Sequence, residues 1–227
     1  MRIALVLYLG GIILLDFSFL NKYSMFFLIG AKNTVVIAAF SVVFGVVLGT
    51  LLGLMKQSKI KVLRLIATAY IEFVRGTPLL VQLFIVYYGL PMNLSAVPAG
   101  IVALTLNSGA YVAEIIRAGI EAIDKGQMEA ARSLGMTHVK AMRYIILPQA
   151  LKNILPVLGN EFITVIKESS IVSVIGVPEI MYNAETVRGN TFKPFEPLLV
   201  AAVIYFVLTY TLSKLVGKVE RRLKTSD

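Results

Sequence analysis

The chain has 227 residues and a formal net charge of +9, and 57% of its residues are hydrophobic. Its mean hydropathy of +0.81 is high for a soluble domain, in which about half of the residues are apolar. The absence of cysteine excludes disulfides, thiol catalysis and cysteine-ligated metal sites. Apolar stretches longer than roughly 18 residues predict an all-α polytopic membrane protein, because backbone polar groups in lipid must pair within their own segment.

The N-terminal apolar stretch covers residues 3–15, between Arg2 and Asp16. It resembles the core of a signal peptide, but no small-residue cleavage site follows it. Thirteen residues are also few for a membrane span. We interpret residues 1–20 as an extra segment, either interfacial or a weak membrane helix, ahead of a membrane domain at 21–220.

The first two predicted spans carry the most informative local patterns. The span at about 25–55 repeats glycine every four residues, at Gly45, Gly49 and Gly53, and this small-residue face permits close helix packing. The span at about 60–90 should break at the string RGTP (75–78), because proline disfavours helix in the residue before it. A break at membrane depth must be buried in protein or line a cavity.

Three further spans are predicted at about 98–123, 151–176 and 198–216. Most of the lysine and arginine residues, 15 of 22, lie in the segments 56–64, 117–152 and 214–224. The two outer loops hold only Arg188 and Lys193. Because basic residues gather in cytoplasmic loops, a loop at 124–150 and a tail at 221–227 are predicted to be cytoplasmic, and the net charge needs no nucleic-acid partner.

The run EAARSLGMTHVKAMRYIILP at 129–148 is a polar, basic island in an apolar chain. Gly135 fits a helix–turn–helix corner, where glycine adopts the left-handed conformation at low cost, and Thr137 can cap the following helix. Its apolar periodicity alone favours an amphipathic interfacial helix without a partner.

The spacing of this run, EAA, three residues, glycine, nine residues and I-x-L-P, resembles the cytoplasmic loop motif of ABC importer permeases. Three further strings resemble the polar amino-acid importers of that family: IEFVRGTPLLVQLFIVYYGLP (71–91), GAYVAEIIRAGIEAI (109–123) and LGNEFITVIKESSIVSVIGVPEI (158–180). The resemblance extends over roughly residues 25–220 and leaves the N-terminal segment outside.

This resemblance implies the five-helix core of a type I ABC importer permease in the bacterial inner membrane. It also implies a second permease subunit (another copy or a sister chain), cytoplasmic ATP-binding subunits and an external solute-binding protein. The chain lacks the phosphate-binding string G-x-x-x-x-G-K-[ST], so we expect no ATP hydrolysis and no cofactor in it. ATP and Mg are expected on the partner ATPase.

Two sets of side chains are predicted to serve this loop. Leu134, Val139, Met142 and Ile146 should pack its helices against the membrane helices. Glu129 offers a carboxylate to a basic partner group, and the alanines after it allow close approach. We expect ATPase coupling through Glu129, Ala130, Ala131, Ser133, Leu134 and Gly135.

Ionisable residues in the spans are costly in lipid, by roughly 2.5–3.5 kcal/mol each, so they should face one another or a wet cavity. Glu72 and Arg75 lie three residues apart, as do Glu114 and Arg117. Because residues at this spacing share a helix face, we expect mutual neutralisation within each pair rather than ligand binding.

Glu161 differs because no cation lies within one helical turn of it. A cationic amino acid would supply one through charge-assisted hydrogen bonds, and a salt bridge to Arg75 or Lys167 is the alternative. In permeases that this chain resembles, an Asn-Glu pair recurs where the cargo is basic. We expect a polar, preferably cationic (arginine, lysine or histidine) amino acid on a route lined by Asn160, Glu161, Thr164, Glu72 and Arg75.

The main alternative is an ion-coupled secondary transporter or channel, with Glu114, Glu161 and Glu168 as proton or cation sites. The short single chain without an evident inverted repeat argues against it. A membrane-embedded enzyme is more remote, because His138 is the only histidine and no metal or Ser-His-Asp pattern is present.

Overall fold

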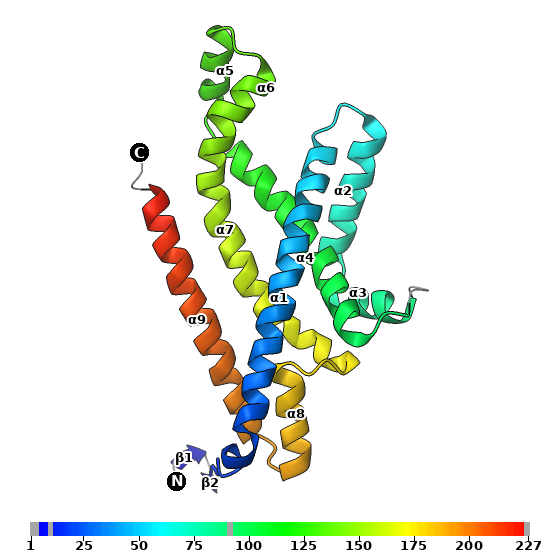
Figure 1. Ribbon diagram of the computed structural model, residues 1–227, viewed down its shortest axis with the longest axis vertical. Helices are drawn as coiled ribbons and strands as arrows, with labels where there is room; N and C mark the ends of the chain where they lie inside the picture. Colours follow the sequence, from blue (N-terminus) through cyan, green and yellow to red (C-terminus); the bar gives the residue numbers. More distant parts are fainter. Residues whose placement is uncertain (1–4, 9–10, 90–92, 225–227) are drawn as a thin grey trace.

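The computed structural model describes residues 5–8, 11–89 and 93–224, and its membrane domain is all-α as predicted. The long helices α1 (Leu20–Lys56), α4 (Ala96–Glu121), α7 (Leu147–Glu168) and α9 (Glu196–Lys224) build the elongated molecule in Figure 1. Helix α1 packs most extensively against α4, and α7 contacts both α4 and α9. Helix α9 continues beyond the predicted end of the fifth span at 216, and residues 225–227 of the predicted tail lie outside the described residues.

Among the described residues, α1, α4 and α9 are long and apolar enough to cross a bilayer. One bent helix pair passes the same test when its two helices are taken together. Helix α7 occupies the predicted fourth span but does not meet this apolar criterion. Lys152, Glu161, Lys167 and Glu168 lie along it, and a short 3-10 helix, η3 (Ser169–Ile175), continues it. A helix of such polarity belongs among protein neighbours or beside an aqueous route rather than in lipid.

The N-terminal segment is not the membrane helix considered for residues 3–20. Strands β1 (Leu5–Tyr8) and β2 (Gly11–Leu14) pair antiparallel, with Leu5 opposite Leu14 and Tyr8 opposite Gly11. The Gly-Gly pair at 10–11 falls between two short apolar runs, a pattern that favours a hairpin over a continuous helix. Residues 1–4 and 9–10 lie outside the described residues, and an interfacial position stays a prediction.

The predicted break in the second span is confirmed. Helix α2 (Lys61–Gly76) ends at Thr77, and α3 (Leu79–Phe84), continued by a π-helix at Ile85–Gly89, leaves at 112°. The buried side chain of Gln82 donates from Nε2 to the Val74 carbonyl at 2.7 Å. In turn, Gln82 accepts a hydrogen bond from Asn107 of α4 at 3.0 Å. These bonds satisfy a backbone carbonyl that the bend releases, which is why it is tolerated at this depth.

The glycine face of α1 is confirmed as a contact surface for α4. A Cβ added at Gly45 would lie 3.2 Å from Ser108, and one at Gly49 would lie 2.7 Å from the carbonyl oxygen of Gly109. The contact loosens at Gly53, where the nearest atom would be 3.9 Å away. The two helices therefore approach most closely near Gly49, as small residues permit.

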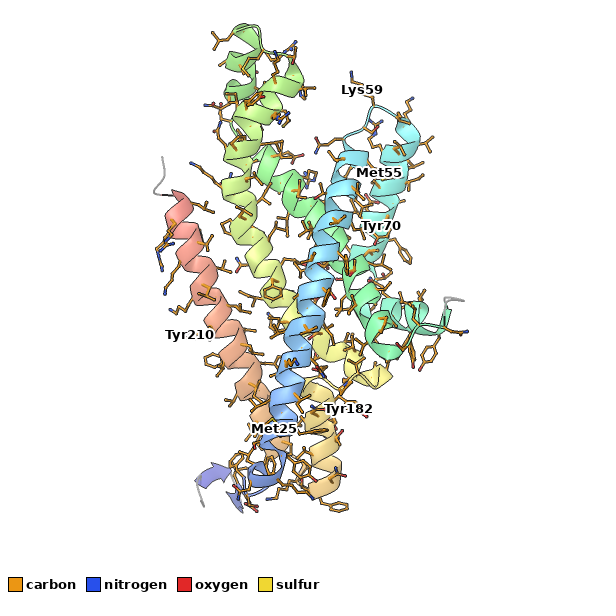
Figure 2. The ribbon with its side chains drawn as sticks, viewed as in Figure 1. Met25, Met55, Lys59, Tyr70, Tyr182 and Tyr210 are labelled. Atoms are coloured by element: carbon orange, nitrogen blue, oxygen red, sulfur yellow. The ribbon has the colours of Figure 1, made fainter. Side chains whose placement is uncertain are left out.

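The two ends of the molecule differ in content. One end carries α5 (Lys125–Ser133), α6 (His138–Ala141), the turn between α1 and α2, and the C-terminal end of α9 (Figure 1). Figure 2 places Lys59 at the tip of that turn and Tyr182 toward the opposite end. The opposite end holds the β-hairpin and α8 (Ile180–Thr191), a helix that sequence reasoning missed in a predicted outer loop. The three segments predicted to be cytoplasmic thus share one end.

Candidate functional site

The loop at 124–150 forms a helical elbow, which we define as α5, the turn at 134–137 and α6. Asp124 caps α5 by accepting from the Gly126 N–H at 2.8 Å, and Thr137 caps α6 by accepting from the Lys140 N–H at 3.3 Å. Gly135 has φ +81°, and a Cβ there would meet no atom within 4 Å. Glycine is therefore needed for its left-handed conformation rather than for space, and the predicted corner is confirmed.

The apolar side chains of the elbow and of the π-helix that follows it differ in burial. Ile146, in the π-helix η2 (Met142–Ile146), is buried as predicted, whereas Leu134 is 85% exposed and Val139 is 74% exposed. The prediction that these two pack against the membrane helices was wrong. The elbow projects past the ends of the other helices, so its tip has no surface of this chain to pack against (Figure 1).

The remaining residues that are predicted to couple to the ATPase lie on the same elbow. Glu129, Ala130 and Ser133 are exposed, but Ala131 is only 5% exposed. The prediction that Ala131 admits a partner surface was therefore wrong, because this chain already covers it. A small residue at a close internal contact and one at a docking surface have the same sequence signal.

One acidic side chain, Glu114, contacts cations from three helices. Glu114 of α4, which is 16% exposed, accepts from Lys56 of α1 at 2.7 Å and from Arg117 at 2.8 Å. The Arg75 guanidinium of α2 lies 3.6 Å from the same carboxylate. Neutralisation of Glu114 by Arg117 is thus confirmed. Because three neighbouring cations favour the ionised carboxylate, Glu114 is a poor proton site for an ion-coupled transporter.

The predicted pairing of Glu72 with Arg75 was wrong. Glu72 is exposed and forms no salt bridge within the described part of the chain. Arg75 instead faces α4, where its guanidinium lies 5.6 Å from the centre of the Tyr111 ring and approaches Glu114. A partly buried carboxylate attracts a cation more strongly than an exposed one three residues away, because solvent screens the exposed pair.

Glu161 lies half-buried on the face of α7 that meets α4. Its Oε1 accepts a hydrogen bond of 2.8 Å from the hydroxyl of Ser108, which is buried in α4. In the described structure it forms no salt bridge with Arg75, Lys167 or any other cation. Sequence reasoning missed Ser108. The one pattern that could have indicated it is its position next to Gly109, a small residue in a close-packed helix.

The other predicted cargo residues lie at different depths. Thr164 is half-buried one turn along α7 from Glu161, whereas Asn160 is exposed. A cavity of about 510 Å³ opens between α2, α4 and α7 and is lined in part by Arg75, Tyr111, Asn153 and Val157. Glu161 is one helical turn from Val157, so the structure brings Arg75 and Glu161 to one region and leaves Glu72 outside it.

The described residues contain no group of three or more His, Cys, Asp or Glu side chains arranged to hold a metal ion. The lining of the cavity offers polar and charged groups that suit reversible binding. Hydroxyl, carboxylate, amide and guanidinium groups converge on it from three helices.

Comparison with known proteins decides the family. The binding-protein-dependent transport system inner membrane component family matches residues 45–225. The chain belongs to this family. The arginine transport system permease protein ArtQ of Bacillus subtilis (strain 168) is 46% identical over 217 residues, which are 94% of this chain and 99% of the relative. The putative glutamine transport system permease protein GlnP of Rickettsia bellii (strain RML369-C) is 43% identical, over 92% of this chain and 100% of its own.

Solved structures agree with these relatives. A crystal structure of an amino acid ABC transporter with histidines contains a chain that is 54% identical, with a TM-score of 0.90 over 92% of this chain and 100% of that chain. The methionine ABC transporter MetNI in an inward-facing form, 21% identical with a TM-score of 0.76 over 89% of this chain and 98% of its own, shares the fold. The protein is thus an inner-membrane permease subunit of an amino-acid ABC transporter, a transport component rather than an enzyme.

Proposed function

We propose that this permease forms the route of an ATP-driven importer of cationic amino acids, namely arginine, lysine or histidine. The observation that carries the proposal is Glu161, a half-buried carboxylate whose described partner is a serine hydroxyl. A charge at this depth is costly without a counter-ion. The guanidinium, ammonium or imidazolium group of a cationic amino acid would supply one through charge-assisted hydrogen bonds.

The relatives support an amino-acid cargo and leave its charge open. One is named for arginine and another for glutamine, and the crystal structure at 54% identity is described with histidines. The side chains of the permease are therefore the evidence from which we infer a charged rather than an uncharged cargo. Asn160 and Thr164 would provide additional hydrogen bonds beside the carboxylate.

The elbow would connect this site to the ATPase. Basic loops favour the cytoplasmic side for the end that carries the elbow and the C-terminus. The exposed apolar tip, with Leu134 and Val139, suits docking on an ATP-binding subunit that holds ATP and Mg. Helical structure is unbroken from His138 to Glu168, so a push on the elbow would reach Glu161 through one stiff rod.

The remaining partners follow from the family. A second permease subunit, either a copy or a sister chain, would complete the route, because the cavity between α2, α4 and α7 opens to the surface of this chain. A solute-binding protein would deliver the amino acid at the end with α8. ATP-driven closure of the two ATPase subunits would then switch the opening of the helices.

The test is uptake by the reconstituted complex of permease, ATPase and binding protein in proteoliposomes loaded with ATP. Glu161→Gln should raise the apparent KM for arginine by roughly tenfold or more, since a hydrogen bond to a charged group contributes about 1.5–3 kcal/mol. Glu72→Gln, which removes an exposed carboxylate on α2 outside this region, is the matched control. An unchanged arginine KM in Glu161→Gln contradicts the proposal, and uptake driven by an ion gradient without nucleotide favours the secondary transporter.

A further inference from the structure

We propose that Arg75 binds the α-carboxylate of the transported amino acid, so that Arg75 and Glu161 together read both ends of one molecule. This assignment rests on the proposed function. It adds a second contact of opposite sign and defines the ligand class as free α-amino acids with a cationic side chain. Amines of the same length that lack a carboxylate are excluded from that class.

Arg75 has hydrogen-bonding capacity to spare. Its side chain is 45% exposed, and its nearest carboxylate oxygen, on Glu114, lies 3.6 Å away, beyond a normal hydrogen bond. Glu114 already accepts from Lys56 and Arg117 at shorter distances. The planar guanidinium therefore retains donors in the paired geometry that suits a carboxylate.

The Tyr111 ring holds this guanidinium at the cavity. The centre of the ring lies 5.6 Å from the guanidinium carbon, within the range of a cation–π contact. Both residues line the cavity of about 510 Å³, a volume within the usual range for a small-molecule site. The binding group is thus positioned before any ligand arrives.

Arg75 also has the weakest contact to an acid of the three cations around Glu114. Lys56 and Arg117 lie 2.7 Å and 2.8 Å from the Glu114 carboxylate, whereas Arg75 lies 3.6 Å away. A ligand carboxylate would give Arg75 the close ion pair that the other two cations already have.

The spacing of the two charged groups fits a doubly charged ligand. On α7, Val157 lines the cavity and Glu161 follows one turn later, about 6 Å along the helix axis. On α4, Tyr111 lines the cavity and Ser108, one turn earlier, donates to Glu161. Arg75, which reaches from α2 onto the Tyr111 ring, and Glu161, which is bound to Ser108, therefore lie against adjacent turns of α4. An amino acid with charges at both ends can lie between them.

The experiment measures direct binding to the permease–ATPase complex in nanodiscs of zwitterionic lipid, without the binding protein, which would otherwise select the ligand. Isothermal titration calorimetry compares L-arginine with agmatine, its decarboxylated analogue. Wild type should bind arginine roughly 10- to 100-fold more tightly than agmatine, the effect of one charge-assisted contact. Arg75→Gln should remove that difference by weakening arginine alone, and Arg75→Lys should restore part of it.

The control is Arg64→Gln, an exposed arginine on the same helix that does not line this cavity. Equal arginine affinity in wild type and Arg75→Gln, with a loss in Glu161→Gln, overturns the carboxylate assignment and leaves the proposed function standing. Equal weakening of arginine and agmatine by Arg75→Gln also overturns it, because it indicates a structural role. No effect of Glu161→Gln on either ligand refutes the proposed function itself.

Discussion

The two ends of the molecule differ in that one holds a buried polar cluster and the other projects as an exposed elbow. At the end with α8, Glu179 and Asn183 are fully buried, and Glu179 accepts from the Tyr205 hydroxyl at 2.6 Å and the Tyr182 N–H at 2.7 Å. At the other end, the elbow leaves Leu134 and Val139 in solvent. The polar set joins α1, α8 and α9 within one chain, whereas this chain leaves the apolar tip uncovered, and we propose that a partner covers it. An exposed apolar surface of this kind marks an interaction site.

A pair of matched glycines gives the largest expected difference between the two ends. Gly135 and Gly176 both have positive φ, of 81° and 85°, and a Cβ added at either would meet open space. Valine at either position forces a left-handed conformation that costs roughly 1–2 kcal/mol. We expect Gly135→Val to reduce transport-coupled ATP hydrolysis about tenfold or more, and Gly176→Val to lower thermal stability while coupling persists. Equal coupling in the two variants would show that the elbow transmits nothing.

Removal of the buried carboxylate tests the self-contained end. Glu179→Ala leaves the Tyr205 hydroxyl and the Tyr182 N–H without their acceptor, and each unsatisfied buried group costs about 1–3 kcal/mol. We expect a loss of unfolding free energy of about 3 kcal/mol, measured by thermal denaturation of the purified protein. Glu185→Ala on the same helix removes only a solvent-exposed pair with Arg188 and should cost under about 1 kcal/mol. Similar losses in both variants would remove the distinction between buried and exposed acids.

The centre of the molecule offers a finer comparison along one glycine face. At Gly49 an added Cβ would lie 2.7 Å from a backbone oxygen of α4, which cannot move without shifting the helix. At Gly53 the nearest atom would be 3.9 Å away. Gly49→Ala should therefore destabilise the protein by about 1–3 kcal/mol, and Gly53→Ala should be nearly neutral or slightly stabilising. A smaller melting-temperature loss for Gly49→Ala than for Gly53→Ala would contradict this packing.

Local signals in the sequence predicted the corner at Gly135, the break after Gly76 and the glycine face of α1. Each depends on a few neighbouring residues whose backbone preferences tertiary structure did not override. The errors concern contacts between distant segments. The partner of Arg75 proved to be Glu114 of another helix, and Ser108, 53 residues before Glu161, had no signal of its role.

The elbow shows a second kind of failure. Apolar periodicity identifies the face of a helix that wants burial, but not whether this chain or a partner covers it. Leu134 and Ile146 carry the same signal, and only the length of the elbow beyond the bundle separates them. Helix α8 was missed because its mixed composition lacks a clear apolar stripe.

The smallest expected effect is a pH dependence at the N-terminal edge of α1. Hydrogen bonds from the Lys193 ammonium and from the Ser18 N–H lower the pKa of the Asp16 carboxyl from 3.8 to about 2. Because the pKa is depressed in the folded state, this contact stabilises the protein above pH 3.8, and its contribution is lost as the pH falls toward 2. Asp16→Asn should reduce the pH dependence of the melting temperature over that interval. The effect should be small, because Asp16 is exposed and solvent screens the ion pair. Identical acid profiles for wild type and variant would show that the contact contributes no stability.

The most direct test of the elbow as the docking site of the ATP-binding subunit is to introduce single cysteines, because the sequence contains none. Single cysteines at Leu134 on the elbow and at Phe192, which is 91% exposed after α8, compare the two ends in the assembled transporter. Leu134→Cys should cross-link to the ATP-binding subunit and resist a membrane-impermeant maleimide in spheroplasts, whereas Phe192→Cys should react with the maleimide and form no such cross-link. Labelling of Leu134→Cys from outside, with no cross-link to the ATPase, would contradict the account.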